Sequence, residues 1–262
     1  MRRYLRLLRI FWGNTLSTEM EYRAGFWSNA ALSLFWLAWA ALSVRAFFRF
    51  SDSIQGWTYD QLLVVMGLFF AINGLRQMLI QPNLSRMSEY IRMGTLDFLL
   101  TKPVSSQFMV SFRHVGVYNW LDPLLGLGLV VFALARSQRP LGLTALLAFS
   151  LLSLAGLAVV YAISLMVQSL AIWAIGSEGL DDLIQGMVEA GRFPVQMYRG
   201  VVRALLTFVI PVAMLTTFPA QALVGEVAMP VIVNVTLVAV ALLWISARIW
   251  RLALRHYSGA SA

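Results

Sequence analysis

The feature that most constrains this chain is a succession of long apolar runs, several of which carry no charge. A helix needs about 20 apolar residues to cross the ~30 Å hydrocarbon core of a bilayer, because it rises ~1.5 Å per residue. Runs of about that length or longer occupy residues 24–44, 60–82, 106–135, 140–177, 204–225 and 227–247. These runs predict an all-α integral membrane protein with several spans.

The composition excludes most other classes of protein. Apolar residues make up 60% of the 262 residues and charged residues 12%, whereas soluble domains average about 25% charged residues. A soluble fold of this size leaves roughly a quarter of its unfolded surface in water, so it cannot hide that much apolar surface. The chain has no Cys and two His. His114 and Asp122 share a helical face, but no third ligand lies near them, so we expect no metal site.

The basic residues predict the number of spans and their orientation. Arg and Lys collect in cytoplasmic loops of membrane proteins. Six spans place three basic clusters, and both termini, on the cytoplasmic side; the clusters are Arg2, Arg3, Arg6, Arg9 and Arg23 before span one, Arg76, Arg86, Arg92, Lys102 and Arg113 around the loop after span two, and Arg248, Arg251 and Arg255 after the last span. A seventh span would move the last cluster outside. We therefore predict that 141–172 is one long helix, since it holds no Pro or turn dipeptide.

Residues 1–22 have the pattern of a helix that lies in the membrane interface. Arg2, Arg6 and Arg9 share one helical stripe, while Tyr4 and Phe11 belong to another. The alternative is a basic start that only satisfies the positive-inside rule.

The loop at 83–105 shows helical spacing, interrupted at Gly94 and ended at Pro103. A short amphipathic helix there suits docking to a soluble partner, with charges at Arg92, Asp97 and Lys102 around an apolar edge of Leu96, Leu99 and Leu100. The alternative is a solvated connector without a partner.

Three stretches resemble one family. They are IRMGTLDFLLTKPVSSQF at 91–108, FPVQMYRGVVRALLTFVIPVAMLTTFPAQALVG at 193–225 and RHYSGAS at 255–261. Together with the order of the spans, they resemble ABC-2 type permeases, in particular a bacterial six-span branch once catalogued as a domain of unknown function. The likeness covers nearly all of 1–262 as a single transmembrane domain.

The resemblance implies the transmembrane subunit of an ATP-driven exporter in the bacterial cytoplasmic membrane. In that family two permeases, identical or related, pair with two separate nucleotide-binding subunits. The first helix is an interfacial elbow, and the loop after span two carries the helix that couples to the ATPase; by position the coupling residues are Arg92, Gly94, Thr95, Leu96, Asp97, Lys102 and Pro103. ATP and Mg would be held by the partner. In agreement, the chain contains no Gly-x-x-x-x-Gly-Lys-Ser/Thr sequence.

Span five has two interpretations. Hydropathy alone assigns it to 204–225. The family pattern assigns it to about 180–198 and folds 200–225 back into the outer leaflet as two short helices broken at Pro211. We prefer the second, because Pro211 and Pro219 interrupt the run and irregular backbone is tolerated at that depth where protein shields it.

Several charges would then lie within the membrane, where they are costly and mark functional sites by default. Glu189 and Arg192 are three residues apart on one helical face and could form an ion pair. With Asp122 they are candidates for the transport pathway, and Arg199 and Arg203 would lie near its outer mouth. The alternatives are a helix-stabilising pair or a cytoplasmic loop.

Two other functional classes compete with the exporter. A membrane-embedded enzyme acting on lipid would need His, Asp or Glu gathered at one face, and a channel or secondary transporter would favour internal repeats, which we do not find. The arginines border apolar runs and form no single patch, so we expect contact with membrane lipid and no nucleic acid. An aromatic-rich interior suits hydrophobic or cationic drugs, toxic compounds or lipid-like molecules.

Overall fold

A computed structural model describes residues 2–19, 23–137, 141–173, 179–225 and 227–257, and no strand occurs among them. Five helical segments are long and apolar enough to cross a membrane: Ala24–Phe47, Tyr59–Arg92, Val117–Ser137, Leu143–Ile172 and Met229–Arg255. A bent pair, Gly200–Thr207 with Val212–Val224, would make a sixth if counted as one span. The predicted all-helical membrane architecture is confirmed at this level.

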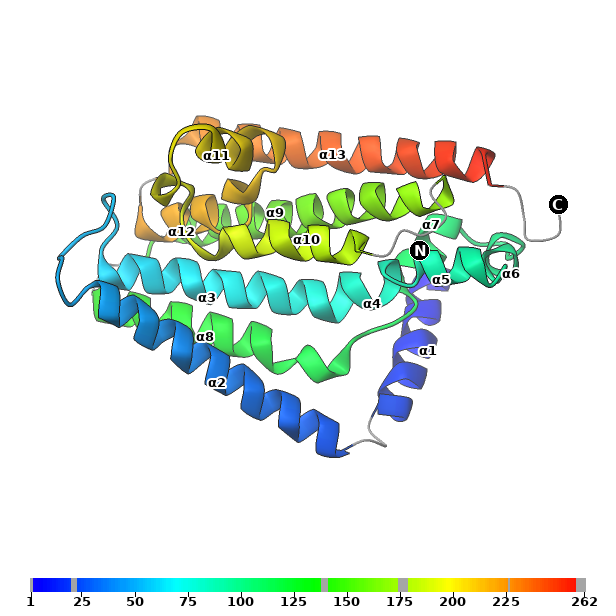
Figure 1. The fold of residues 1–262 in the computed structure, drawn as a ribbon, viewed down its shortest axis with the longest axis horizontal. Coiled ribbons are helices and arrows are strands. Elements are labelled where there is room, and N and C mark those ends of the chain that lie inside the picture. The colour runs from blue at the N-terminus through cyan, green and yellow to red at the C-terminus, as the bar shows by residue number, and fades with distance from the viewer. Residues whose placement is uncertain (1, 20–22, 138–140, 174–178, 226, 258–262) are drawn as a thin grey trace.

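The long helices form an elongated bundle (Figure 1). They are α2 (Arg23–Phe47), α3 (Tyr59–Leu75), α8 (Leu121–Ser137), α9 (Leu143–Ser169) and α13 (Met229–Arg255). α3 packs mainly on α8, and α9 packs mainly on α13. The start of α1 (Arg2–Glu19) and the end of α13 lie at the same end of the bundle, which we call the terminal end. An even number of passes is consistent with this arrangement.

α1 runs across the terminal end at a large angle to the bundle (Figure 1). Its Trp12 Nε1 donates to the Phe112 carbonyl oxygen at 3.3 Å, and the Tyr4 ring meets Phe108 edge-on at 4.7 Å. A helix therefore covers most of the predicted segment 1–22. Its position in a membrane interface stays a prediction.

Small residues bring α3 and α8 into backbone contact. A Cβ at Gly67 would lie 2.6 Å from the Gly126 carbonyl oxygen, and one at Gly74 would lie 2.6 Å from Asp122 Cβ. Between apolar helices in lipid, such close approach supplies the dispersion contacts that hold the pair together. At the far end of the pair, Arg136 Nε lies 3.2 Å from Asp60 Oδ1.

The second span continues past α3 as a bent helical path. A π-helical turn, η1 (Arg76–Ile80), leads into α4 (Gln81–Leu84) and α5 (Met87–Arg92), and α6 (Leu96–Leu100) follows a turn at Gly94. Gly94 has φ +66°, a conformation that glycine adopts without steric cost. The segment from Tyr59 to Arg92 is thereby one helical path of 34 residues.

The third apolar run, 106–135, contains the candidate span Val117–Ser137, and its first part forms a separate helix. The segment 113–116 separates α7 (Ser106–Phe112) from η2 (Val117–Asn119) and α8. Asn83 stabilises the break: its Nδ2 donates to the His114 carbonyl oxygen, and its Oδ1 accepts from the His114 amide, both at 2.7 Å. These bonds satisfy backbone groups that would otherwise bond within a helix. By contrast, the single long helix predicted over 141–172 is confirmed by α9 and η3 (Leu170–Ile172).

After residue 179 the chain forms short helices. α10 (Leu180–Glu189) runs beside α3 and α9, and η4 (Ala190–Arg192), η5 (Val195–Met197) and α11 (Gly200–Ala204) follow. Then come η6 (Leu205–Val209), η7 (Val212–Met214) and α12 (Thr217–Val224). The two halves of 200–224 are bent by 60° around Pro211, at the end of the bundle away from the termini (Figure 1).

Candidate functional site

A polar cavity, open to the surface beside Trp36 and Glu189, lies between α2, α3, the start of α8 and α10. Its volume is about 430 Å³. Three of the five predicted pathway residues line it, together with amides and aromatic rings: Asn29, Leu32, Ser33, Trp36, Phe69, Phe70, Asn73, Gln77, Asn119, Asp122, Gln185, Glu189 and Arg192. Polar groups gathered inside a membrane bundle are costly, so such a cavity is a candidate functional site.

A chain of hydrogen bonds runs from the interior of the bundle into this cavity. The Arg76 side chain is 2% exposed. Its Nε donates to Asn73 Oδ1 at 3.2 Å, and its Nη2 donates to Gln185 Oε1. Gln185 Nε2 in turn donates to Glu189 Oε1 at 2.8 Å. The buried cation and the cavity carboxylate are thus linked through one amide, which meets part of the cost of burying the charge.

The ion pair expected between Glu189 and Arg192 is not formed. Arg136 and Asp60 make the one ion pair among the described residues. The Glu189 carboxylate instead accepts from Gln185, one turn back on the same helix, and α10 ends at Glu189. The Arg192 Nε is buried without a hydrogen-bond partner. Arg192 therefore enters the cavity with unused hydrogen-bonding capacity.

Asp122 lies on the opposite wall of the cavity, at the start of α8. Ser33 of α2 is its hydrogen-bonding neighbour. Nearby, Asn29 Nδ2 donates to the Tyr118 carbonyl oxygen at 2.6 Å and to Asn119 Oδ1 at 3.4 Å, which ties α2 to η2. The acid is therefore held where α2, α3 and α8 meet.

The remaining predicted residues of the outer segment lie elsewhere. Arg199 and Arg203 are exposed on and beside α11, and neither lines the cavity. Pro211 is buried at the bend between η6 and η7. The assignment of Arg199 and Arg203 to an outer mouth stays a prediction.

The predicted coupling residues lie at the terminal end, on α5 and α6, in the turn between them and just after α6 (Figure 1). Arg92, Thr95, Lys102 and Pro103 are exposed, and Gly94 and Asp97 are partly buried. Burial, together with the nearby charge of Asp97, raises the pKa of Tyr257 just beyond α13. The segment therefore contacts the chain's own C-terminal region on one side.

The prediction that Leu96 and Leu99 present an apolar edge to a partner is wrong. Both side chains are buried and pack in a core cluster with Met87 and Leu84. The turn at Gly94 folds α6 back, so its apolar stripe faces the bundle. The exposed apolar side chains of this segment are instead Met93, at 64% exposure, and Phe98, at 71%.

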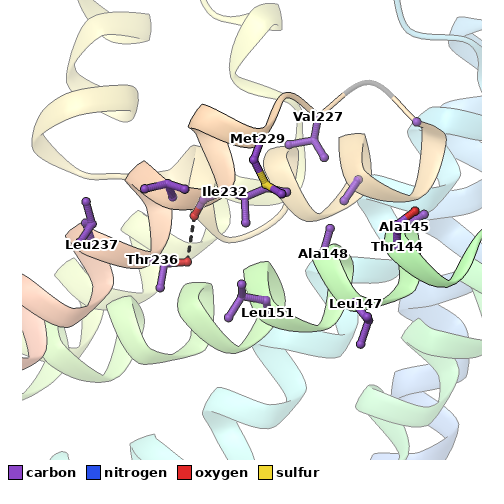
Figure 2. A pocket seen from close by; sticks show the side chains of 13 residues that line it. Thr144, Ala145, Leu147, Ala148, Leu151, Val227, Met229, Ile232, Thr236 and Leu237 are labelled. Carbon is purple, nitrogen blue, oxygen red and sulfur yellow. Dashed lines mark hydrogen bonds between the residues drawn. The ribbon is translucent and has the colours of Figure 1, made fainter.

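A second cavity, of about 790 Å³, lies between the start of α9, α12 and the start of α13 (Figure 2). Apolar side chains such as Leu147, Leu151 and Ile232 line it. The Thr236 hydroxyl donates to the Ile232 carbonyl oxygen at 2.8 Å, within its own helix. This cavity suits apolar groups.

Sequence reasoning missed Arg76 and Gln185. The charge pattern groups Arg76 with the basic residues around the loop after span two, yet its side chain lies inside the bundle. A signal existed: Asn73, Arg76 and Gln77 interrupt an apolar run within one turn of helix, and a π-helical turn often accompanies a functional site.

A family model described as ABC-2 family transporter protein matches residues 34–261, most of the chain. No curated protein and no solved structure matches it. The C-terminal part of the RHYSGAS stretch, from residue 258 onward, lies outside the described residues. The match begins within α2 and covers every helix after it, so the chain belongs to the ABC-2 transporter family.

Proposed function

We propose that this chain is the transmembrane permease subunit of an ATP-binding-cassette exporter, with ATP and Mg bound by separate ATPase subunits. Family membership supports the permease role. The observation that carries the proposal is the polar cavity, which holds Asp122, Glu189 and Arg192 between apolar helices. Charged side chains between membrane helices cost stability, so a bundle with a purely structural role would not retain them. A transporter needs a cavity that can hold its substrate.

The continuous path from Tyr59 to Arg92 supplies a means of coupling. The proposed ATPase contact at α5 and α6 lies at one end of this path, and Arg76, whose guanidinium holds Gln185, lies within it. A displacement of α5 would move Arg76 and with it the link to Glu189. Both ends are rigid helices joined by a π-helical turn, which can take up a change in register.

The proposed orientation has both termini in the cytoplasm of a bacterium, so that the terminal end meets the ATPase. On this model α10 with its extension to about residue 198 is span five, and 200–225 is a re-entrant segment in the outer leaflet. Two permeases, identical or related, would complete the transporter. The bend of 60° around Pro211 and the position of α10 beside α3 and α9 support this assignment.

The substrate class that the cavity fits best is an amphiphilic organic cation. Two carboxylates, Asp122 and Glu189, outnumber the one guanidinium, Arg192, among the charged side chains that line it. The aromatic rings of Trp36, Phe69 and Phe70 line it as well. Acids and π-faces together favour a cation with apolar groups. We expect Glu189→Gln to reduce efflux of a fluorescent organic cation from cells that express the transporter. Unchanged efflux at equal expression would remove the cavity from the pathway.

Co-purification from the native host tests the partner. The tagged chain should retain an ATPase near stoichiometry, identified by mass spectrometry. Phe98→Asp should lower the retained ATPase, because it places a charge on an exposed apolar contact at the terminal end. Phe50→Asp is the matched control, since Phe50 is 90% exposed and lies in the loop before α3, away from the termini.

Recovery of the chain alone, or transport by the purified chain without any ATPase, would favour the competing channel or secondary-transporter function. Equal loss of the ATPase in both Phe variants would contradict the proposed docking surface.

A further inference from the structure

A third cavity lies outside the proposed pathway, between α1 and the break that precedes η2. Its volume is about 470 Å³. It is lined by Ile10, Phe11, Asn14, Thr15, Arg86, Arg113 and His114. Residues from three separate parts of the chain therefore meet there, and the positive charges come from two of them.

Hydrogen bonds between separate segments of the chain hold the walls of the cavity. Asn83, 1% exposed, brackets the backbone of His114 with two bonds of 2.7 Å, and Tyr90 Oη lies 3.3 Å from His114 Nε2. On the other wall, Trp12 joins α1 to the Phe112 carbonyl oxygen. Arg86 and Arg113 therefore lie on backbone that hydrogen bonds hold in place.

The cavity carries positive charge without a compensating acid. Neither Arg86 nor Arg113 lies within 4.0 Å of a carboxylate in the part of the chain that the structure describes. Burial and the charges of both arginines lower the pKa of His114 to about 4, so this ring is neutral at pH 7. Two cations close enough to act on one imidazole make a site for an anion.

The surroundings indicate which anion. The span Tyr59–Arg92 ends and the span Val117–Ser137 begins beside this cavity, so it lies at the level where helices leave the hydrocarbon. Ile10 and Phe11 of α1 add apolar surface to the same walls. A ligand with a negative head and apolar chains matches this combination.

We propose that the cavity between α1 and the 113–116 segment binds the phosphate headgroup of an anionic phospholipid, held by Arg86 and Arg113. Such a lipid would join α1 to the core of the bundle. The site is separate from the proposed transport pathway and does not depend on it.

Native mass spectrometry of the full chain in detergent tests the proposal. The probes are phosphatidylglycerol, zwitterionic phosphatidylcholine and soluble glycerol phosphate. We expect phosphatidylglycerol to bind more tightly than phosphatidylcholine. The double variant Arg86→Gln/Arg113→Gln should weaken phosphatidylglycerol binding by roughly tenfold or more, since each basic residue near an anionic lipid contributes several-fold to binding.

The matched control is Arg251→Gln/Arg255→Gln, which removes two exposed charges at the same end of the bundle. It should change the affinity less than twofold. The single variant Arg86→Gln, at an exposed side chain, and the double Arg→Lys variant at 86 and 113 keep the test valid if the first double variant does not fold. The single variant should lose a severalfold part of the affinity, and the Lys variant should retain most of it.

Equal weakening in the control would mean that net charge alone attracts the lipid, and would overturn the site. Equal affinity for phosphatidylcholine would do the same. Displacement of phosphatidylglycerol by millimolar glycerol phosphate would identify a soluble phosphate as the occupant and refute the lipid.

Discussion

The crossing of α3 and α8 provides a sharp test, because it supports the wall of the cavity that carries Asp122. In Gly126→Ala, the new Cβ would lie 2.4 Å from the Ala71 amide nitrogen and 2.5 Å from the Gly67 carbonyl oxygen. Both are backbone atoms of α3, so no side chain can rotate away. The two helices must move apart, and their contacts along the crossing weaken.

The expected cost is about 1–3 kcal/mol, the usual penalty for adding a methyl group to a packed contact. The same substitution at Gly128 is the control, because it measures the effect of Gly→Ala on stability without a steric clash. Gly128 lies in the same helix, and a Cβ there would meet nothing within 4 Å. Gly128→Ala should therefore be neutral or gain up to about 1 kcal/mol from lower backbone entropy of the unfolded chain.

Unfolding of both variants in detergent, by heat or by titration with a denaturing detergent, gives the comparison. Gly126→Ala should be less stable than Gly128→Ala by about 1–3 kcal/mol. We also expect Gly126→Ala to lower transport, since separation of α3 from α8 moves Asp122. Equal stability of the two variants would refute the close backbone contact.

Three further predictions follow from individual contacts. Arg76→Leu and Gln185→Leu each remove the same hydrogen bond, so their effects on the free energy of unfolding should be non-additive. A double-mutant cycle should give a coupling energy of about 1 kcal/mol or more. Additive effects would contradict this hydrogen bond. Asp97→Arg should uncouple ATP hydrolysis from transport without unfolding the chain, and normal transport by this variant would count against the coupling segment. Because the pKa of His114 is lowered in the folded state, the unfolded chain binds a proton on this ring more readily than the folded chain does. The resulting contribution to the free energy of unfolding is fully present above pH 6.5 and is lost as the pH falls to about 4. After discounting for solvent screening, the wild type should lose about 1–2 kcal/mol more than His114→Gln over this window in pH-dependent unfolding, and parallel curves would refute the shift.

Hydropathy and charge, read along the chain, determine how often this protein can enter the membrane. A seventh span would move the C-terminal basic cluster outside, and the run holds no Pro or turn dipeptide, so the single helix at Leu143–Ile172 follows from the sequence alone. The spacing of apolar residues also predicts helices at Met87–Arg92 and Leu96–Leu100. The family resemblance rests on the same local stretches, and the match over 34–261 confirms it.

Tertiary structure decided what each polar group does. Arg76 resembles a loop charge in the sequence, and only the approach of Gln185 from α10 makes it a buried member of a network. Leu96 has the pattern of an exposed edge until the turn at Gly94 directs it inward. The break at 113–116 depends on Asn83, some thirty residues earlier. Such outcomes depend on which distant group arrives to satisfy a hydrogen bond or cover an apolar face, and local periodicity carries no information about that partner.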